Sequence, residues 1–193
     1  VEGKIAAILH IREHGIPYLG LCYGMQLACI EFARHVVGLR SAHTTEVNAK
    51  TTHPIIDTMR EQERAIAEHA YGGTMRLGAY PCRLAKGTIA ATAYGRHWDA
   101  KQMRNGDVLT AERHRHRYEF NNRYRDRLAR KGLVFSGVNP ERDLVEIIEL
   151  PKQTHPFFVG VQFHPEFKSR PLQPHPLFRQ FVGGAVAHGK RTS

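Results

Sequence analysis

A cysteine between two glycines is the residue whose surroundings in this sequence most favour nucleophilic chemistry. The segment reads Gly20-Leu21-Cys22-Tyr23-Gly24-Met25-Gln26. An apolar run over 16–21 predicts a buried strand before it, and an apolar pattern over 25–37 predicts a helix after it. Cys22 would therefore lie at a strand-to-helix turn, where its sulfur is held out of the sheet as in a nucleophile elbow.

The turn should also tune the thiol. The positive end of a helix dipole favours a thiolate, so we expect a lowered pKa for Cys22. The amide N–H of Tyr23 would stabilise the oxyanion of a tetrahedral intermediate. Because Gly-x-Cys-x-Gly is a short pattern, a buried structural cysteine is the alternative interpretation.

A histidine and a glutamate two residues apart end a second apolar run, which spans 157–163. This segment reads Val161-Gln162-Phe163-His164-Pro165-Glu166-Phe167. A thiol nucleophile needs a base, and the base needs an acceptor that orients it. His164 would take the proton of Cys22 and pass it to the leaving group, while Glu166 fixes the imidazole tautomer. The alternative is a structural histidine, since the chain contains 13 histidines.

Together, the two motifs resemble the pattern of the class I glutamine amidotransferases. In that family, Gly-x-Cys-x-Gly-x-Gln is followed far downstream by His-Pro-Glu. The resemblance assigns the catalytic roles to Cys22, His164 and Glu166. It implies that the cysteine attacks the side-chain amide of L-glutamine, that ammonia leaves, and that water hydrolyses the glutamyl thioester.

Longer segments resemble the CTP synthase branch of that family. They are Glu31-Phe32-Ala33-Arg34, His53-Pro54-Ile55-Ile56-Asp57, Gly72-Gly73-Thr74-Met75-Arg76-Leu77-Gly78, Glu112-Arg113-His114-Arg115-His116-Arg117-Tyr118-Glu119, Asn121-Asn122, Ser136-Gly137, Leu144-Val145-Glu146-Ile147-Ile148-Glu149 and Lys168-Ser169-Arg170-Pro171. The resemblance covers nearly the whole chain, so we expect 1–193 to be one glutamine amidotransferase domain. It would supply ammonia for the amination of UTP to CTP, in a separate synthetase domain that binds UTP, ATP and Mg²⁺.

The resemblance also implies a set of glutamine-binding residues. The residues that would line the pocket are Tyr23, Gly24, Met25 and Gln26. Glu46 would bind the α-amino group of the substrate, and Arg117 would lie near its α-carboxylate. Tyr23 stands where this branch usually has Leu, and His43-Thr44 replaces the usual Asn-Ser. The alternatives are a solvated acid at Glu46 and an exposed basic loop around Arg117.

Composition limits the partners and the compartment. The formal net charge is +10, but the basic residues are spread along the chain without an aromatic-interleaved signature, so we expect no nucleic-acid partner. No apolar run approaches the ~20 residues that a membrane span needs. The cysteines are Cys22, Cys29 and Cys82. This sparse, odd number favours a reducing, cytoplasmic location, and without a Cys-x-x-Cys pair we expect no structural zinc site. The resemblance assigns ATP and Mg²⁺ to the synthetase domain, so we expect no metal and no cofactor in this chain.

The sequence begins at Val1, whereas the CTP synthase branch carries a glycine-rich loop just before this point that supplies a second oxyanion donor. We therefore expect an N-terminally truncated fragment without its first strands, that loop and the synthetase domain. Loss of one such donor costs about 100-fold or more, so the activity of the fragment is open. The rival functions are a non-catalytic binding or regulatory domain and a stand-alone γ-glutamyl hydrolase. A homo-oligomer is expected only for the full-length parent.

These motifs need a scaffold of alternating helices and strands. Besides the strand at 16–21, strands are expected over 133–137, 144–150 and 157–163. A turn at 72–78 should lead into a further strand, and 84–89 should form a short strand and a turn. Helices are expected over 2–14, 25–37, 123–131 and 176–188, with a short helix within 54–69 and an exposed loop over 94–106. The alternation predicts an α/β fold, a three-layer sandwich with a mixed, mostly parallel sheet flanked by helices.

Overall fold

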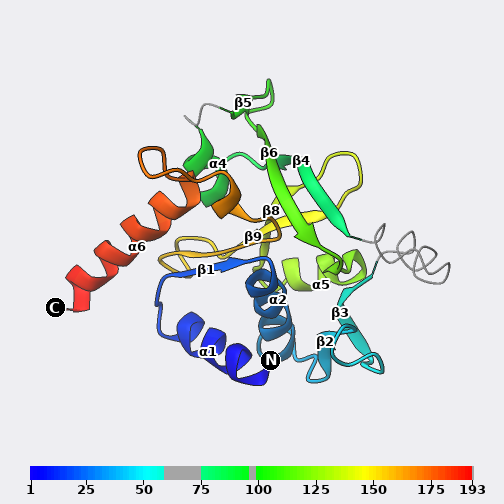
Figure 1. Cartoon of the computed structure of the whole chain (residues 1–193). Coiled ribbons are helices and arrows are strands. Elements are labelled where there is room, and N and C mark those ends of the chain that lie inside the picture. Colours follow the sequence, from blue (N-terminus) through cyan, green and yellow to red (C-terminus); the bar gives the residue numbers. More distant parts are fainter. Residues whose placement is uncertain (59–74, 96–98, 193) are drawn as a thin grey trace.

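A seven-stranded sheet between two layers of helices forms the body of the molecule (Figure 1). The computed structural model describes residues 1–58, 75–95 and 99–192. The helices are α1 (Glu2–Glu13), α2 (Tyr23–His35), α4 (Ile89–Tyr94), η2 (Asn122–Tyr124), α5 (Arg125–Ala129), η3 (Pro165–Phe167) and α6 (Pro176–Thr192). The strands are β1 (Tyr18–Leu21), β2 (Ala42–Thr44), β3 (His53–Asp57), β4 (Arg76–Leu84), β5 (Lys101–Gln102), β6 (Val108–His116), β7 (Glu119–Phe120), β8 (Val134–Val138), β9 (Val145–Glu149) and β10 (Phe158–Val161).

The large sheet has the order β1-β10-β9-β8-β4-β6-β5, and β2-β3-β7 form a small second sheet. The predicted mixed sheet is confirmed, but the expectation of mostly parallel strands is wrong. Among the described strands of the large sheet, β1 and β10 form the one parallel pair. The physical reason is that β8, β9 and β10 follow one another without an intervening helix, and short connections join antiparallel neighbours.

The two faces of the sheet bury separate apolar clusters, which confirms the three layers. Along β10, Phe158 packs with α1 and α2, whereas Val159 and Val161 pack with residues of α4 and α6. This alternation is the two-residue period of a strand covered on both faces. Strand β10 is therefore held between two packed apolar clusters.

Helix α2 packs directly on the sheet. Every residue from Met25 to Ala33 is buried, as expected for a helix that is apolar on nearly all sides. Gly160 of β10 permits this approach, because a Cβ there would come within 3.1 Å of the Met25 Cα atom. The close packing fixes the N-terminus of α2 relative to the ends of β1 and β10.

Most predicted elements are confirmed with shifted ends: the helices at 2–14, 25–37, 123–131 and 176–188 and the strands at 16–21, 133–137, 144–150 and 157–163. The strand expected after a turn at 72–78 is β4, which already begins at Arg76, and residues 72–74 of the expected turn lie outside the described residues. The strand expected over 84–89 is wrong, because β4 ends at Leu84 and Thr88 caps α4 by accepting the Ala91 N–H. The helix expected within 54–69 begins instead as strand β3, and its remainder from residue 59 lies outside the described residues.

Strand β6 is the longest of the elements that the sequence analysis missed. It forms a nine-residue antiparallel ladder with β4, and β5 within the expected 94–106 loop continues the sheet. Its alternation is hidden because the buried side chains are polar: His114 and His116 face inward, while Arg113 and Arg115 are exposed. Over the described ranges, no helix has the length and apolar character needed to cross a membrane.

Candidate active site

Cys22 occupies a strained turn between β1 and α2. Its backbone angles are φ 48° and ψ −100°, in a region that non-glycine residues rarely adopt. Such strain costs on the order of 1–3 kcal/mol and persists only where the surroundings enforce it. Here the Cys22 N–H donates to the carbonyl of Val161 at 2.7 Å, which ties the turn to the end of β10. The strained strand-to-helix turn that the sequence predicted for Cys22 is therefore present.

A tyrosine that the sequence analysis did not single out closes the turn. The Tyr18 hydroxyl donates to the carbonyl of Gly24 at 2.9 Å, and its ring stacks on Phe158. Gly20 leaves room for this contact, since a Cβ there would lie 2.5 Å from the hydroxyl oxygen and 2.8 Å from the Gly24 carbonyl carbon. The first glycine of the motif is thus required by close packing.

The thiol is protonated in this environment. Partial burial raises the pKa of Cys22 to about 11, with Glu119 and Glu166 adding to the rise. Hydrogen bonds from the Tyr23 amide and the Gln162 side chain favour the thiolate but do not outweigh burial. The expectation of a lowered pKa at the helix N-terminus is therefore wrong for this state, and forming a thiolate requires a base.

The predicted base, His164, and its predicted orienting acid, Glu166, are paired directly. Nδ1 of His164 lies 2.6 Å from Oε1 of Glu166, so the ring donates to the carboxylate. The His164 amide donates to the carbonyl of Arg113 on β6 at 2.9 Å, and Phe167 stacks on the imidazole. In the described part of the chain, the buried Nε2 atom has no hydrogen-bond partner. The ring is therefore oriented with Nε2 available for proton transfer.

Parallel pairing brings the two motifs to one edge of the sheet. Leu21 pairs with Val161, so the segments that follow β1 and β10 begin side by side. Among the described residues, no hydrogen bond joins the Cys22 sulfur to His164, and the sulfur accepts instead from Gln162 at 3.7 Å. Catalytic hydrogen bonds are often long or poorly aligned without substrate. The missing hydrogen bond between Cys22 and His164 is therefore compatible with a nucleophile–base pair.

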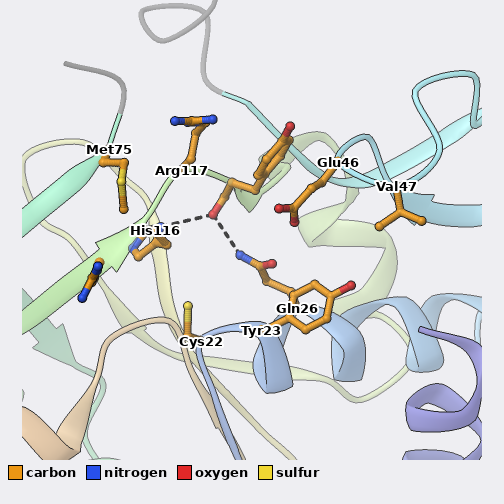
Figure 2. Close-up of a pocket in the computed structure, with 10 residues that line it drawn as sticks. Cys22, Tyr23, Gln26, Glu46, Val47, Met75, His116 and Arg117 are labelled. Carbon is orange, nitrogen blue, oxygen red and sulfur yellow. Dashed lines mark hydrogen bonds between the residues drawn. The ribbon is translucent and has the colours of Figure 1, made fainter. Parts of the chain in front are cut away.

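The Cys22 sulfur points into a cleft of about 550 Å³ (Figure 2). Its lining residues are Cys22, Tyr23, Gln26, Glu46, Val47, Met75, Arg115, His116, Arg117 and Tyr118. The structure thus brings four predicted binding residues, Tyr23, Gln26, Glu46 and Arg117, to the same cleft as the cysteine. Glu46 comes from the loop after β2 and Arg117 follows β6, so their opposite charges reach the cleft from different segments.

Two predicted binding residues, Gly24 and Met25, are not among those that line the cleft. The Met25 side chain is fully buried in the core against Gly160, so it does not line the cleft. The carbonyl of Gly24 is engaged by Tyr18. Spacing within the motif did not reveal this, because α2 buries even the side chains nearest the cysteine.

A buried group of charged and imidazole side chains lies behind the cleft, and the sequence analysis missed it. Arg76 binds Glu146 at 2.5 Å and contacts Glu119 at 3.5 Å. His114 and His116 are joined by a 2.8 Å hydrogen bond and contact these carboxylates at 3.5 Å. One signal pointed to this group: alternate residues of a strand share a face, so His114 and His116 would be buried together once β6 was recognised.

Burial controls protonation in this group. It raises the pKa of Glu119 to about 8 and that of Glu146 to about 7, although Arg76 opposes both shifts. It lowers the pKa of His114 to about 2 and that of His116 to about 3, and the charge of Arg76 adds to both shifts. Both imidazoles are therefore neutral near pH 7.

The loop that carries Glu166 is anchored by a second polar cluster. Lys168 donates to the carbonyl of Ala111 at 2.6 Å, contacts Glu112 at 3.3 Å and binds Asp99. Tyr94 donates to the same Glu112 oxygen at 2.8 Å. These contacts hold the loop against β6. In the described ranges, no group of three or more His, Cys, Asp or Glu residues is arranged to hold a metal ion.

Comparison with known proteins gives the class. The family model described as "Glutamine amidotransferase class-I" matches residues 1–183. The chain belongs to the class I glutamine amidotransferase family, as the spacing of its cysteine and histidine motifs predicted.

Within that family its relatives are CTP synthases. It is 57% identical to the CTP synthase of Moorella thermoacetica over 96% of this chain and 32% of that protein. It is 59% identical to that of Caldanaerobacter subterraneus over 94% of this chain and 31% of that protein. The chain thus spans about a third of the length of these relatives, and the resemblance to the CTP synthase branch is confirmed.

Solved structures agree on the fold. The glutaminase domain of Trypanosoma brucei CTP synthase, solved with bound acivicin, is 36% identical with a TM-score of 0.83, covering 96% of this chain and 66% of that one. A putative GMP synthase component from Thermoplasma acidophilum is 14% identical with a TM-score of 0.55, covering 97% of this chain and 67% of that one. The second likeness concerns the fold alone.

Proposed function

We propose that this chain hydrolyses L-glutamine to glutamate and ammonia through Cys22, His164 and Glu166. One observation carries the proposal: the Cys22 sulfur, on a strained turn, opens into a cleft that also presents Glu46 and Arg117. A carboxylate and a guanidinium beside a nucleophile suit the ammonium and carboxylate of an amino acid. Both ends of the substrate would be bound, leaving its side-chain amide to face the sulfur.

The chemistry follows from the protonation states. Because the thiol rests protonated, its proton passes to Nε2 of His164 as the sulfur attacks the amide carbon. Glu166 stabilises the imidazolium through Nδ1, and the Tyr23 N–H donates to the oxyanion. The imidazolium gives its proton to the nitrogen, the C–N bond breaks, and ammonia leaves.

The second half returns the enzyme to its starting state. Water occupies the space vacated by ammonia and gives a proton to His164 as its oxygen attacks the glutamyl thioester. The C–S bond breaks, the sulfur regains a proton from His164, and glutamate leaves. Every step uses side chains and water, so this chain needs no metal or cofactor for its share of the reaction.

The names of the relatives suggest where the ammonia goes. We propose that a synthetase domain takes it to aminate UTP to CTP, with ATP and Mg²⁺ bound by that domain rather than by this chain. The relatives are about three times longer than the aligned segment, which leaves room for such a domain in them. A cytoplasmic location, the absence of a nucleic-acid partner and homo-oligomerisation of a full-length parent belong to the same proposal.

Two rival functions predict different behaviour. A non-catalytic regulatory domain would bind glutamine without consuming it, and the paired His164 and Glu166 beside the cysteine elbow disfavour it. A stand-alone γ-glutamyl hydrolase would accept larger γ-substituents. Similarity to CTP synthases along 94–96% of the chain disfavours that alternative.

Glutamate release tests the proposal. Purified chain would be incubated with glutamine beside the Cys22→Ala variant and, as a matched control, Cys29→Ala, which removes a buried thiol on the same helix. We expect release by the wild type and Cys29→Ala that is lost in Cys22→Ala. Binding of glutamine without release by a folded sample would favour the regulatory alternative, and faster release from γ-glutamyl amides than from glutamine would favour the hydrolase.

A further inference from the structure

The nucleophile has a polar neighbour to which neither the motif analysis nor the family assignment gave a role. Gln162 is fully buried, and its Nε2 atom lies 3.7 Å from the Cys22 sulfur. Its place follows from strand register, because Leu21 and Val161 pair at the ends of their strands and are followed directly by Cys22 and Gln162. The backbone N–H of Gln162 donates to the backbone carbonyl of Glu146 at 2.8 Å, which fixes the backbone at this point.

A relay of two buried amides orients the Gln162 side chain. The carbonyl of Tyr118 can only accept, and Nε2 of Gln26 donates to it at 2.9 Å (Figure 2, dashed line). The same Gln26 nitrogen donates to Oε1 of Gln162 at 3.2 Å. Gln162 must therefore present its oxygen to Gln26, which leaves its N–H groups facing the sulfur.

We propose that Gln162 is a positioning residue that donates an N–H hydrogen bond to Cys22 and holds the thiolate in the rotamer required for attack. This inference rests on the proposed use of Cys22 as the nucleophile. A thiolate accepts hydrogen bonds more strongly than a thiol, so the contact strengthens as the proton leaves. The hydrogen bond from Gln162 lowers the pKa of Cys22, as expected for a bond that favours the thiolate. Burial has the larger and opposite effect on this pKa.

Several charged groups from other segments also act on the sulfur. The carboxylates of Glu119 on β7 and Glu166 on η3 disfavour the thiolate. The other charged or titratable residues of the cleft are Tyr23, Glu46, Arg115, His116, Arg117 and Tyr118. His164 supplies the base from the segment after β10. None of these groups is altered by a substitution at Gln162, so a change in thiol titration can be traced to the lost donor.

The test is the pH profile of Cys22 alkylation by iodoacetamide, which requires no turnover of glutamine. Gln162→Met keeps the length of the side chain but removes the donor, and Gln153→Met makes the same change at an exposed glutamine. Cys22→Ala gives the background from the two fully buried cysteines. We expect the apparent pKa of alkylation to rise by about one unit in Gln162→Met, so that alkylation below the pKa slows about tenfold. Gln153→Met should match the wild type.

An unchanged pH profile in a folded Gln162→Met variant would overturn the proposal. If that variant does not fold, Gln162→Leu replaces it, because leucine also removes the donor and adds no charge beside the sulfur. It should shift the profile in the same direction, and a wild-type profile would again overturn the proposal. Failure of glutamate release with the alkylation shift intact would count against the proposed function alone.

Discussion

Glu166 and His164 form a hydrogen bond of 2.6 Å that uses one ring nitrogen and leaves the other, buried, without a hydrogen-bond partner in the described part of the chain. Because the carboxylate can only accept, Nδ1 carries the proton and Nε2 offers its lone pair. The tautomer needed by a base acting on Cys22 is thereby set before substrate binds. Catalysis should depend on this pair, on the cleft and on the turn that carries the cysteine.

Replacing Glu166 with Gln should impair proton transfer more than substrate binding. The amide cannot stabilise an imidazolium as a carboxylate does, so we expect kcat for glutamate release to fall about 100-fold or more with little change in KM. Steady-state kinetics of the purified variant would measure both constants. Glu141→Gln changes an exposed glutamate that does not line the cleft and should leave both unchanged. A wild-type kcat in Glu166→Gln would remove Glu166 from the mechanism.

Replacing Glu46 with Gln should weaken glutamine binding. The variant removes the charge that we assign to the substrate ammonium, so KM should rise about tenfold or more while kcat changes little. The matched control is Glu13→Gln, at an exposed glutamate near the end of α1. An unchanged KM would show that Glu46 is a solvated loop acid, and a fall in kcat alone would show that it acts on the reacting atoms instead.

The sequence indicated which residues gather at the candidate site more accurately than it indicated the strands of the scaffold. Cys22, His164 and Glu166 stand out because strand ends, glycines and a base–acid pair are visible in a linear pattern. Strand β6 is not visible in this way, since its inward side chains include His114, Glu112 and His116, which look like a solvated run. Such residues are buried together with partners that are distant in the chain, such as Glu146, which contacts His114 from more than 30 positions away.

Two further differences between the sequence-based expectations and the structure, at Met25 and at Cys22, have local causes. Met25 was expected in the glutamine pocket because it lies within the cysteine motif, but close packing of α2 on Gly160 turns it into the core. The thiol of Cys22 was expected to have a lowered pKa from the helix N-terminus. Burial and two carboxylates outweigh that effect, and neither can be weighed before the fold is known.

Replacing Gly20 with Ala should destabilise the turn through a clash with Tyr18. A methyl group there would lie 2.5 Å from the Tyr18 hydroxyl oxygen, so we expect a loss of about 1–3 kcal/mol in the free energy of unfolding. Urea denaturation would measure this loss. Tyr18→Phe removes the hydroxyl, so the double variant should be more stable than the sum of the two single changes predicts. Strict additivity would contradict the proposed clash.

The raised pKa of Glu119 makes stability depend on pH in a definite direction. Burial raises this pKa to about 8 from an ordinary 4.5, so the folded state keeps a proton that the unfolded state loses. The resulting stabilisation is complete below the pKa that Glu119 has in the unfolded chain. It is lost as pH rises toward the pKa of Glu119 in the folded protein. Glu119→Gln cannot ionise and should lose less stability than the wild type between about pH 5 and pH 8.

Urea denaturation across that pH range would compare the two proteins. Glu141→Gln, at an exposed glutamate, should follow the wild type at every pH. A pH dependence that is the same in Glu119→Gln and the wild type would mean that Glu119 is ionised throughout, held by Arg76.

The most direct test of the account is whether a glutamyl group becomes covalently attached to Cys22. The chain would be mixed with glutamine, quenched in acid within one turnover and digested, and the peptide containing Cys22 would be analysed by mass spectrometry. We predict a mass increase equal to one glutamyl group on Cys22, which accumulates in Glu166→Gln if loss of the carboxylate slows thioester hydrolysis more than its formation. Glutamate formed without any adduct on Cys22, or formed equally by Cys22→Ala, would contradict the mechanism.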